Sequence, residues 1–215
     1  MQLAVYWENE VNVEHEIKTL REALQRVEAR AQAAEDYIAV CNLQRAYGFY
    51  VDKFQWDQVA DLFARESSLE INGRGRFFGQ DRIREYMHHF GSPQPGVLMN
   101  HIQLQPIVHI AENGTTAKCR CRALMQVGRM GGEALWGEGI YENEYVKEDG
   151  VWKISKLRAY QSFYTPFDKG WAVEASPLMG AFDDFPADAP TEPYPVYPDV
   201  FVPPYHYENP VTGRK

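Results

Sequence analysis

Cysteine is scarce in this sequence, with three residues in 215, and the short motifs of metal and nucleotide binding do not occur. Cys41 stands alone, and Cys119 and Cys121 are two positions apart, a spacing that fits neither a disulfide framework nor paired C-x-x-C zinc motifs. No H-E-x-x-H, G-x-G-x-x-G or G-x-x-x-x-G-K-[ST] motif is present. Zinc, dinucleotide and P-loop chemistry therefore lose their usual sequence support, and we expect no metal and no cofactor.

Long apolar runs and an excess of positive charge are missing as well. No run approaches the roughly 20 apolar residues that cross a bilayer. The net charge is −8, which opposes a nucleic-acid partner, because phosphate binders need a clustered basic face. The first residues, MQLAVYWENEV, have neither the basic nor the apolar region of a signal peptide. We expect a cytoplasmic protein with no membrane and no nucleic-acid partner.

Proline is nearly absent before residue 165, and ten of the thirteen prolines lie beyond it. This change in composition divides the chain into residues 1–35, 36–165 and 166–215. In the first segment, apolar residues recur at steps of three and four, which predicts an amphipathic helix over about residues 12–35 with a stripe of Ile17, Leu20, Leu24, Val27, Ala31 and Ala34. The stripe fits a helix that covers the core and a seam between subunits equally well.

The middle segment, residues 36–165, is typical of an α+β fold. Helical spacing runs through residues 36–53 and 56–65, and the NG turn in ESSLEINGRGRFFG predicts a hairpin of two short strands. The helical pattern QDRIREYMHHF then precedes four strand candidates, MNHIQLQPIVHI, TTAKCRCRALMQVGRM, EALWGEGIYENEYVK and VWKISKLRAYQSFY. Helices followed by a meander predict a curved antiparallel sheet with helices packed on one face.

The last segment, residues 166–215, is rich in both proline and aromatic residues. Proline favours extended conformations, whereas a disordered tail would be poor in aromatics. We expect this extended tail to wrap over the body or over a neighbouring subunit, with its aromatic side chains as anchors. The alternative is a segment that serves as a ligand for another protein.

Two residues are candidates for proton transfer. Asp52 lies in AYGFYVDKFQWDQVADLF, among aromatic residues and four positions before Trp56. A carboxylate in apolar surroundings suits general acid–base catalysis, and the structural alternative is a helix cap or an ion pair. His101, near the start of the first long strand, exchanges protons near neutral pH if it faces a pocket, and otherwise is a packed core histidine.

Other histidines are weaker candidates. His109 lies eight positions after His101 and shares its face unless Pro106 introduces a bulge. At about 3.3 Å per residue it is too far along the strand to join the same site. His88 and His89 diverge by about 100° on a helix, so they cannot both face a pocket. His88 is the candidate for the pocket rim, and a solvated pair is the alternative.

The order of these motifs resembles the SnoaL-like branch of the nuclear transport factor 2-like superfamily. The resemblance covers about residues 36–165 and rests on Tyr47 and Asp52 followed by W-D, on EINGRGRFFGQDRIREYM, on NHIQLQPIVHI and on EDGVWKI. It implies a cone made by a curved sheet wrapped around helices and open at one end to an apolar pocket. Members include cofactor-free dehydratases, isomerases, cyclases and lyases, but also binding and scaffold proteins, so the fold alone does not give an activity.

Within that branch the chain is similar to the scytalone dehydratases, which implies catalytic roles for Asp52 and His101. The second histidine of that pattern falls near Val127, where this chain has none. Its serine and asparagine fall near Gly139 and Tyr141. The resemblance therefore carries the acid and one histidine but not the substrate of those enzymes.

The family register also implies which side chains face the pocket. In WGEGIYENEYV, an inward face would carry Gly137, Gly139, Tyr141 and Asn143, where the glycines leave room for a flat ligand or accommodate a bent strand. Tyr141 is then a catalytic candidate and Asn143 a hydrogen-bonding one.

On the preceding strand the same alternation gives an inward set of Ala117, Cys119, Cys121, Ala123, Met125 and Val127. Lys118, Arg120 and Arg122 would face outward against the acidic strand, in a subunit interface. The residues that we expect to bind substrate are Tyr47, Tyr50, Met125, Val127, Asn143, Tyr160 and His88.

The long N-terminal helix and the tail VPPYHYENPVTG also resemble bacterial members that act on lignin-derived diaryl compounds. In those, a diarylpropane diol loses water and then formaldehyde to give a stilbene. The implied function is a cofactor-independent lyase or dehydratase acting on a hydrophobic phenolic substrate. The alternatives are a non-catalytic binding or scaffold protein, the small subunit of an aromatic ring-hydroxylating dioxygenase, and an isomerase of steroid type. The family also implies a homo-dimer or homo-trimer with the tail and the N-terminal helix at the interface.

Overall fold

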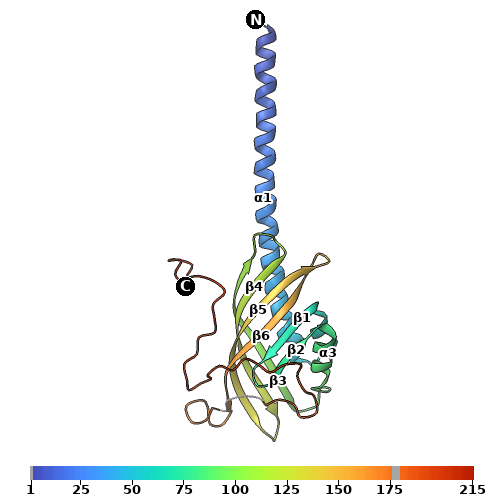
Figure 1. Cartoon of the computed structure of the whole chain (residues 1–215), viewed down its shortest axis with the longest axis vertical. Helices are drawn as coiled ribbons and strands as arrows, with labels where there is room; N and C mark the ends of the chain where they lie inside the picture. The colour runs from blue at the N-terminus through green and yellow to red at the C-terminus, as the bar shows by residue number, and fades with distance from the viewer. Residues whose placement is uncertain (1, 176–179) are drawn as a thin grey trace.

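A computed structural model describes residues 2–175 and 180–215, with side chains from residue 13 onward (Figure 1). A long helix enters a body made of one six-stranded sheet and two short helices, and an extended tail follows. Along the chain the elements are α1 (Gln2–Asp52), α2 (Trp56–Asp61), β1 (Phe63–Ile71), β2 (Gly75–Phe78), α3 (Gln80–His88), β3 (Val97–Ile110), β4 (Thr116–Arg129), β5 (Ala134–Glu148) and β6 (Val151–Pro166). The arrangement is the predicted α+β fold.

α1 is one continuous helix of 51 residues, where the sequence predicted separate helices over residues 12–35 and 36–53. At 1.5 Å per residue it is about 77 Å long. It contains no proline, and its one glycine, Gly48, lies close to its C-terminus, so nothing breaks it at residue 35. Its first half projects away from the body as an isolated rod, and its second half packs inside the curved sheet (Figure 1).

The sheet has the strand order β2-β1-β6-β5-β4-β3. β1 pairs with β6 in parallel, and all other neighbours are antiparallel, as the meander predicts. The second helix is shorter than the predicted 56–65, because Leu62 already accepts a hydrogen bond from Ile154 of β6 and the chain continues as β1. The predicted inward faces of β4 and β5 are confirmed, since their members are buried or half-buried in the core.

Polar side chains join α1 to the sheet inside the core. Gln44 accepts hydrogen bonds from Asn143 (2.8 Å) and Tyr145 (2.5 Å) and donates one to Gln103. About two turns toward the N-terminus, Asp36 accepts from Trp152 Nε1 (2.7 Å) and pairs with Lys147. These partners lie on β3, β5 and β6, so the bonds fix the depth at which α1 enters the cone.

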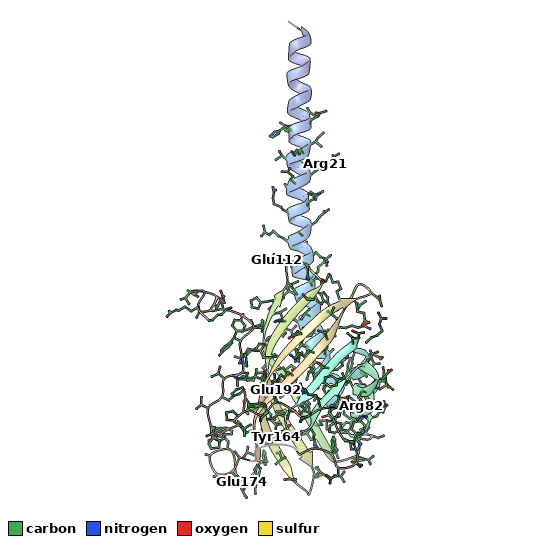
Figure 2. All side chains as sticks on the ribbon, in the orientation of Figure 1. Arg21, Arg82, Glu112, Tyr164, Glu174 and Glu192 are labelled. Carbon is green, nitrogen blue, oxygen red and sulfur yellow. The ribbon has the colours of Figure 1, made fainter. Side chains whose placement is uncertain are left out.

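The tail crosses the outer face of the sheet of its own chain, with Glu192 lying over the strands (Figure 2). The ring of Tyr194 packs against Tyr160 and Phe201, and the Tyr205 ring covers Arg120 at 4.1 Å. The outward basic residues of β4 therefore meet the acidic residues of β5 beneath the tail. Within the described residues, no helix is both long and apolar enough to cross a membrane.

Candidate active site

An apolar cavity of about 280 Å³ lies between the end of α1, helix α3 and the inner face of the sheet. Its wall is mainly aromatic and aliphatic, with His101, Arg74 and Gln161 as its polar members. The apolar residues that line it include Tyr47, Val51, Trp56, Tyr86, Met87, Phe90, Met99, Met125, Val127, Tyr141, Tyr164 and Phe182. A largely apolar cavity with a few convergent polar groups is the usual form of a small-molecule site.

Asp52 is held where α1 ends. Phe54 adopts a positive φ of 57°, and the N–H of Gln55 donates to the carbonyl of Tyr50 (3.0 Å), which closes the helix in a Schellman arrangement. Asp52 does not cap the next helix, because the N-cap of α2 is Gln55 and no side chain bonds there. Instead Asp52 Oδ1 accepts the backbone N–H of His101 at 2.6 Å.

His101 and Asp52 form the pair that the sequence predicts. His101 Nδ1 faces Asp52 Oδ1 at 3.4 Å, and both side chains are mostly buried. A carboxylate beside Nδ1 favours the tautomer with its proton on that nitrogen, which leaves Nε2 as the basic atom. His101 lines the cavity, and Asp52 supports it from behind.

Three tyrosines at the cavity carry hydroxyls that stay protonated at neutral pH. Burial raises the pKa of Tyr164 to about 12, and burial also raises the pKa of Tyr47 and of Tyr141. The rings of Tyr47 and Tyr141 meet edge to face at 6.0 Å. These hydroxyls are therefore suited to donate hydrogen bonds to a ligand and not to act as bases.

The two inward glycines of β5 leave room for the protein's own side chains and backbone, not for a ligand. A Cβ on Gly137 would meet the ring of Tyr164 at 2.5 Å, and a Cβ on Gly139 would meet the carbonyl of Tyr160 at 2.8 Å. The room that the sequence assigned to a flat ligand is thus filled above Gly137 by Tyr164, which itself lines the cavity. Gly139 allows β6 to approach closely.

Four predicted binding residues lie away from the cavity wall or turn from it, namely Asn143, Tyr50, Tyr160 and, in a surface network described next, His88. The Asn143 side chain already donates to Gln44 and accepts from the backbone N–H of Arg158. Tyr50 is not among the residues that line the cavity. The Tyr160 ring packs on the tail at the outer face, although the residue borders the cavity.

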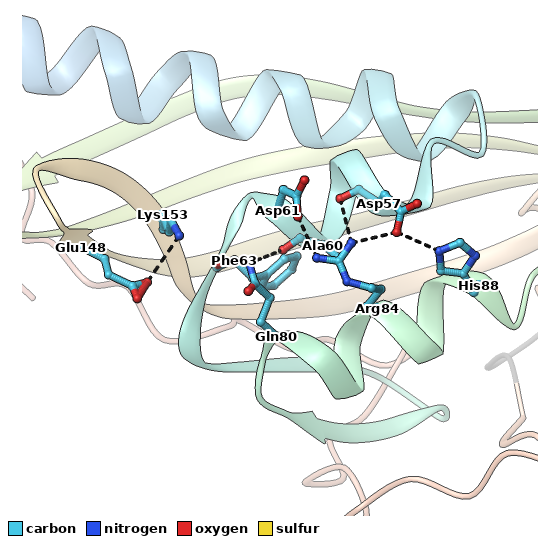
Figure 3. A network of polar contacts seen from close by, with 9 residues as sticks. All are labelled: Asp57, Ala60, Asp61, Phe63, Gln80, Arg84, His88, Glu148 and Lys153. Carbon is cyan, nitrogen blue, oxygen red and sulfur yellow. Dashed lines mark hydrogen bonds and ion pairs between the residues drawn. The ribbon is translucent and has the colours of Figure 1, made fainter.

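His88 belongs to a surface network between α2 and α3. Its Nε2 lies 3.0 Å from Asp57, which also binds Arg84, as Figure 3 shows. It is half exposed and does not line the cavity. The alternative of a solvated, structural histidine therefore describes it.

His109 lies on the opposite face from His101. The register of β3 on β4 shifts between Leu104 and Ile107, at Pro106, so a bulge interrupts the alternation. His109 then points outward, where its Nδ1 lies 3.0 Å from Nε2 of His206 in the tail.

Two polar residues of the cavity were not predicted from the sequence. Arg74 follows the NG turn of the β1–β2 hairpin, and Gln161 lies in β6. A turn arginine has no sequence signal for burial. Gln161 is inward because β6 has an extra residue between Gln161 and Phe163 in its pairing with β5, which strict alternation does not reveal.

Metal ligands do not converge here. Among the residues that the structure describes, no group of three or more His, Cys, Asp or Glu side chains could hold an ion. Cys119 and Cys121 are buried in the core, and the hydrogen bond that Cys121 donates to Cys119, together with burial, raises the pKa of Cys121. They act as the small apolar residues that the sequence suggested.

Comparison with known proteins gives consistent matches. The SnoaL-like domain matches residues 32–158, more than half of the chain. Hexachlorocyclohexane dehydrochlorinase 1 of Sphingobium indicum is 24% identical over 119 residues, which are 54% of this chain and 75% of that protein.

Solved structures agree in fold. A hexachlorocyclohexane dehydrochlorinase from Novosphingobium barchaimii has a TM-score of 0.56 at 19% identity, over 64% of this chain and 94% of its own. A protein from Novosphingobium aromaticivorans assigned as a scytalone dehydratase has a TM-score of 0.55 at 18% identity, over 70% of this chain and 97% of its own. At these identities the likeness establishes the architecture and leaves the reaction to the site.

Proposed function

Because the chain belongs to the SnoaL-like domain family, whose match spans residues 32–158, we propose that it is a lyase or dehydratase that works by proton transfer without a cofactor. The observation that carries the proposal is the Asp52–His101 pair beside a largely apolar cavity. The names of the relatives, dehydrochlorinase and dehydratase, both denote eliminations. An elimination needs a positioned base, which His101 would supply beside apolar walls.

The substrate that suits the cavity is a hydrophobic phenolic compound. An apolar cavity of about 150 Å³ holds a benzene ring, so the 280 Å³ here accommodates a ligand of about two rings. The hydroxyls of Tyr47 and Tyr141, kept protonated by burial, can hold an oxygen of such a ligand. A lignin-derived diarylpropane diol has the required size and chemistry.

For this substrate, elimination begins with the phenol. His101 Nε2 takes the phenolic proton, and the resulting imidazolium, stabilised by Asp52, delivers that proton to the benzylic hydroxyl. The benzylic C–O bond breaks, water leaves, and the ring and its benzylic carbon become a quinone methide. Atoms and charge balance, and the pair returns to its starting state.

The second elimination uses the quinone methide as the electron sink. His101 Nε2 takes the proton of the terminal hydroxyl, the bond to that carbon breaks, and formaldehyde leaves. The released electron pair forms the central double bond and restores the aromatic ring, whose oxygen regains a proton from the imidazolium. The products are a stilbene, formaldehyde and water.

The test is incubation of purified protein with phenolic diarylpropane diols, their phenol methyl ethers and hydroxynaphthalenones. Stilbene or naphthol absorbance and formaldehyde are followed together. We expect turnover of a free phenol and none of its methyl ether, because the ether cannot give a neutral quinone methide.

Equal turnover of phenol and ether would contradict the quinone-methide route. Tight binding of the whole panel with no turnover would instead favour a non-catalytic binding protein. Release of water without formaldehyde would keep the dehydratase and remove the second step.

A further inference from the structure

Arg74 brings a positive charge to an otherwise apolar cavity. It lies in the β1–β2 turn and lines the cavity, and burial lowers the pKa of its guanidinium. Its Nη1 donates to the carbonyl of Gly180 (2.6 Å), and its guanidinium stacks on Phe182 at 3.9 Å. No carboxylate in the described part of the chain lies within salt-bridge distance of it, whereas the similarly half-buried Arg158 pairs with Glu70 and Glu192.

A second unpaired donor faces the same space. Gln161 is 4% exposed and lines the cavity, and its Nε2 has no hydrogen-bond partner among the described residues. Arg74 Nε is buried without a partner in the same way. Buried donors are almost always satisfied, so two that border one cavity indicate a ligand that supplies acceptors.

The two donors come from neighbouring strands. Ile71, the last residue of β1, pairs with Ala159 of β6, two positions before Gln161, and Arg74 follows in the turn after Ile71. His101 lies on β3, which β5 and β4 separate from β6 in the sheet. All three side chains line one cavity, so a ligand that fills it can contact both the donors and His101.

We propose that Arg74 and Gln161 form a subsite for an acidic oxygen carried by an aromatic ring, a phenolate or a carboxylate. A guanidinium N–H and a neutral amide N–H are both donors, and an anionic oxygen accepts from both while neutralising the buried charge. Tyr86 and Tyr164 border the subsite. The charge of Arg74 partly offsets the rise that burial causes in the pKa of both hydroxyls. The inference rests on the proposed function and deepens it, since the acidic oxygen would be on the second ring of a diaryl substrate, while His101 acts on the ring that loses water.

The test is calorimetric binding of two probes of equal size, biphenyl-4-carboxylate and biphenyl-4-carboxamide, which cannot react. Wild-type protein is expected to prefer the carboxylate by roughly 10-fold or more, as a charge-assisted bond provides. Arg74→Gln should bring the preference to about one, Arg74→Lys should keep part of it, and Gln161→Leu should reduce it. The matched control is Arg76→Gln on the next strand, whose side chain bonds to Pro190 in the tail, and it should keep the full preference.

Binding of the carboxamide, unchanged within about threefold, shows that each variant keeps its cavity. A wild-type protein without preference, or an Arg74→Gln variant that keeps it, would overturn the proposal. Loss of both probes in Arg74→Gln and Arg74→Lys alike would assign Arg74 a structural role and overturn it too.

The ultraviolet titration of bound 4-phenylphenol distinguishes the two acidic groups. Ionisation at a lower pH than in water, lost in Arg74→Gln, identifies a phenolate site, and a carboxylate preference without that shift identifies a carboxylate site. Because the probes do not react, a preference without turnover of any diol would leave the subsite standing and remove the lyase proposal.

Discussion

At the scale of single residues, the position of Asp52 is electrostatically demanding. It is the last residue of α1, where the helix dipole disfavours an anion. The N–H of His101, at 2.6 Å, offsets this by donating to Oδ1, and the imidazole faces the same oxygen. An asparagine oxygen can accept the same backbone N–H, so Asp52→Asn removes the charge while keeping the bond that fixes the position.

The buried tyrosines make stability depend on alkaline pH. Burial raises the pKa of Tyr164 to about 12, above its value of about 10 in an unfolded chain. The folded state therefore keeps a proton that the unfolded state loses, so the free energy of unfolding falls as pH rises from about 10 through 12. In urea titrations over this range, Tyr164→Phe should flatten the fall by up to about 1.4 kcal/mol per pH unit. Equal slopes in wild type and variant would contradict this.

At the scale of elements, the bonds of Asp36 hold α1 in the cone. Asp36→Ala leaves Lys147 and the indole N–H of Trp152 without their partner. We expect a loss of unfolding free energy of about 2–3 kcal/mol in urea. Glu35→Ala, at an exposed neighbouring position, is the control and should change stability by less than about 0.5 kcal/mol. A similar small loss in both would show that α1 is held by apolar packing alone.

Contacts between ionisable side chains join the tail to the sheet. His206 contacts Glu142 with Nδ1 and His109 with Nε2, each at 3.0 Å, and Arg120 pairs with the same Glu142. Burial and the charge of His206 lower the pKa of His109. Below pH 6.5 the folded state therefore binds fewer protons at His109 than the unfolded state does. The free energy of unfolding is unaffected by His109 above that pH and falls as the pH drops below it.

An NMR titration of the histidine rings checks this arrangement. His109 should titrate below 6.5 in the wild type and move upward in His206→Gln and in a chain that ends at residue 201. An unchanged His109 in both would show that the tail does not dock on the sheet in solution.

The elements also show where sequence reasoning succeeds. Alternation over unbroken stretches of β4 and β5 predicted the inward face correctly, and the structure places Asp52, the acid before Trp56, beside His101. The bulge that the sequence allowed at Pro106 is present and turns His109 outward. In β6 the extra residue after Gln161, which the sequence did not reveal, puts Tyr160 outside and Tyr164 inside despite their even spacing. Arg74 could not be found because its burial depends on contacts with Gly180 and Phe182, more than 100 positions away.

At the scale of the whole molecule, the rod of α1 exposes an apolar stripe. Val13, Ile17, Leu20, Leu24 and Val27 are each 43–68% exposed, on the part that projects beyond the body. β3 forms the edge of the sheet, and its Ile102 and Leu104 are exposed to a similar extent. Exposed apolar residues gathered on one element are typical of interfaces.

We expect the chain to form a homo-dimer or homo-trimer through this stripe. Light scattering after size-exclusion chromatography should give two or three times the monomer mass for the wild type. Leu20→Glu with Leu24→Glu should lower the mass, while Arg21→Glu, on the same turn but charged already, should not. A wild-type monomer would contradict the interface.

Proton transfer by the Asp52–His101 pair is measured by the kcat of Asp52→Asn and His101→Gln on whichever phenolic diol the wild type converts. Both variants should keep the wild-type circular dichroism and affinity for the diol. Each should lose roughly 100-fold or more in kcat, because general acid–base catalysis contributes on that order. Unchanged kcat in either variant would contradict the account, since the pair would then not carry the proton.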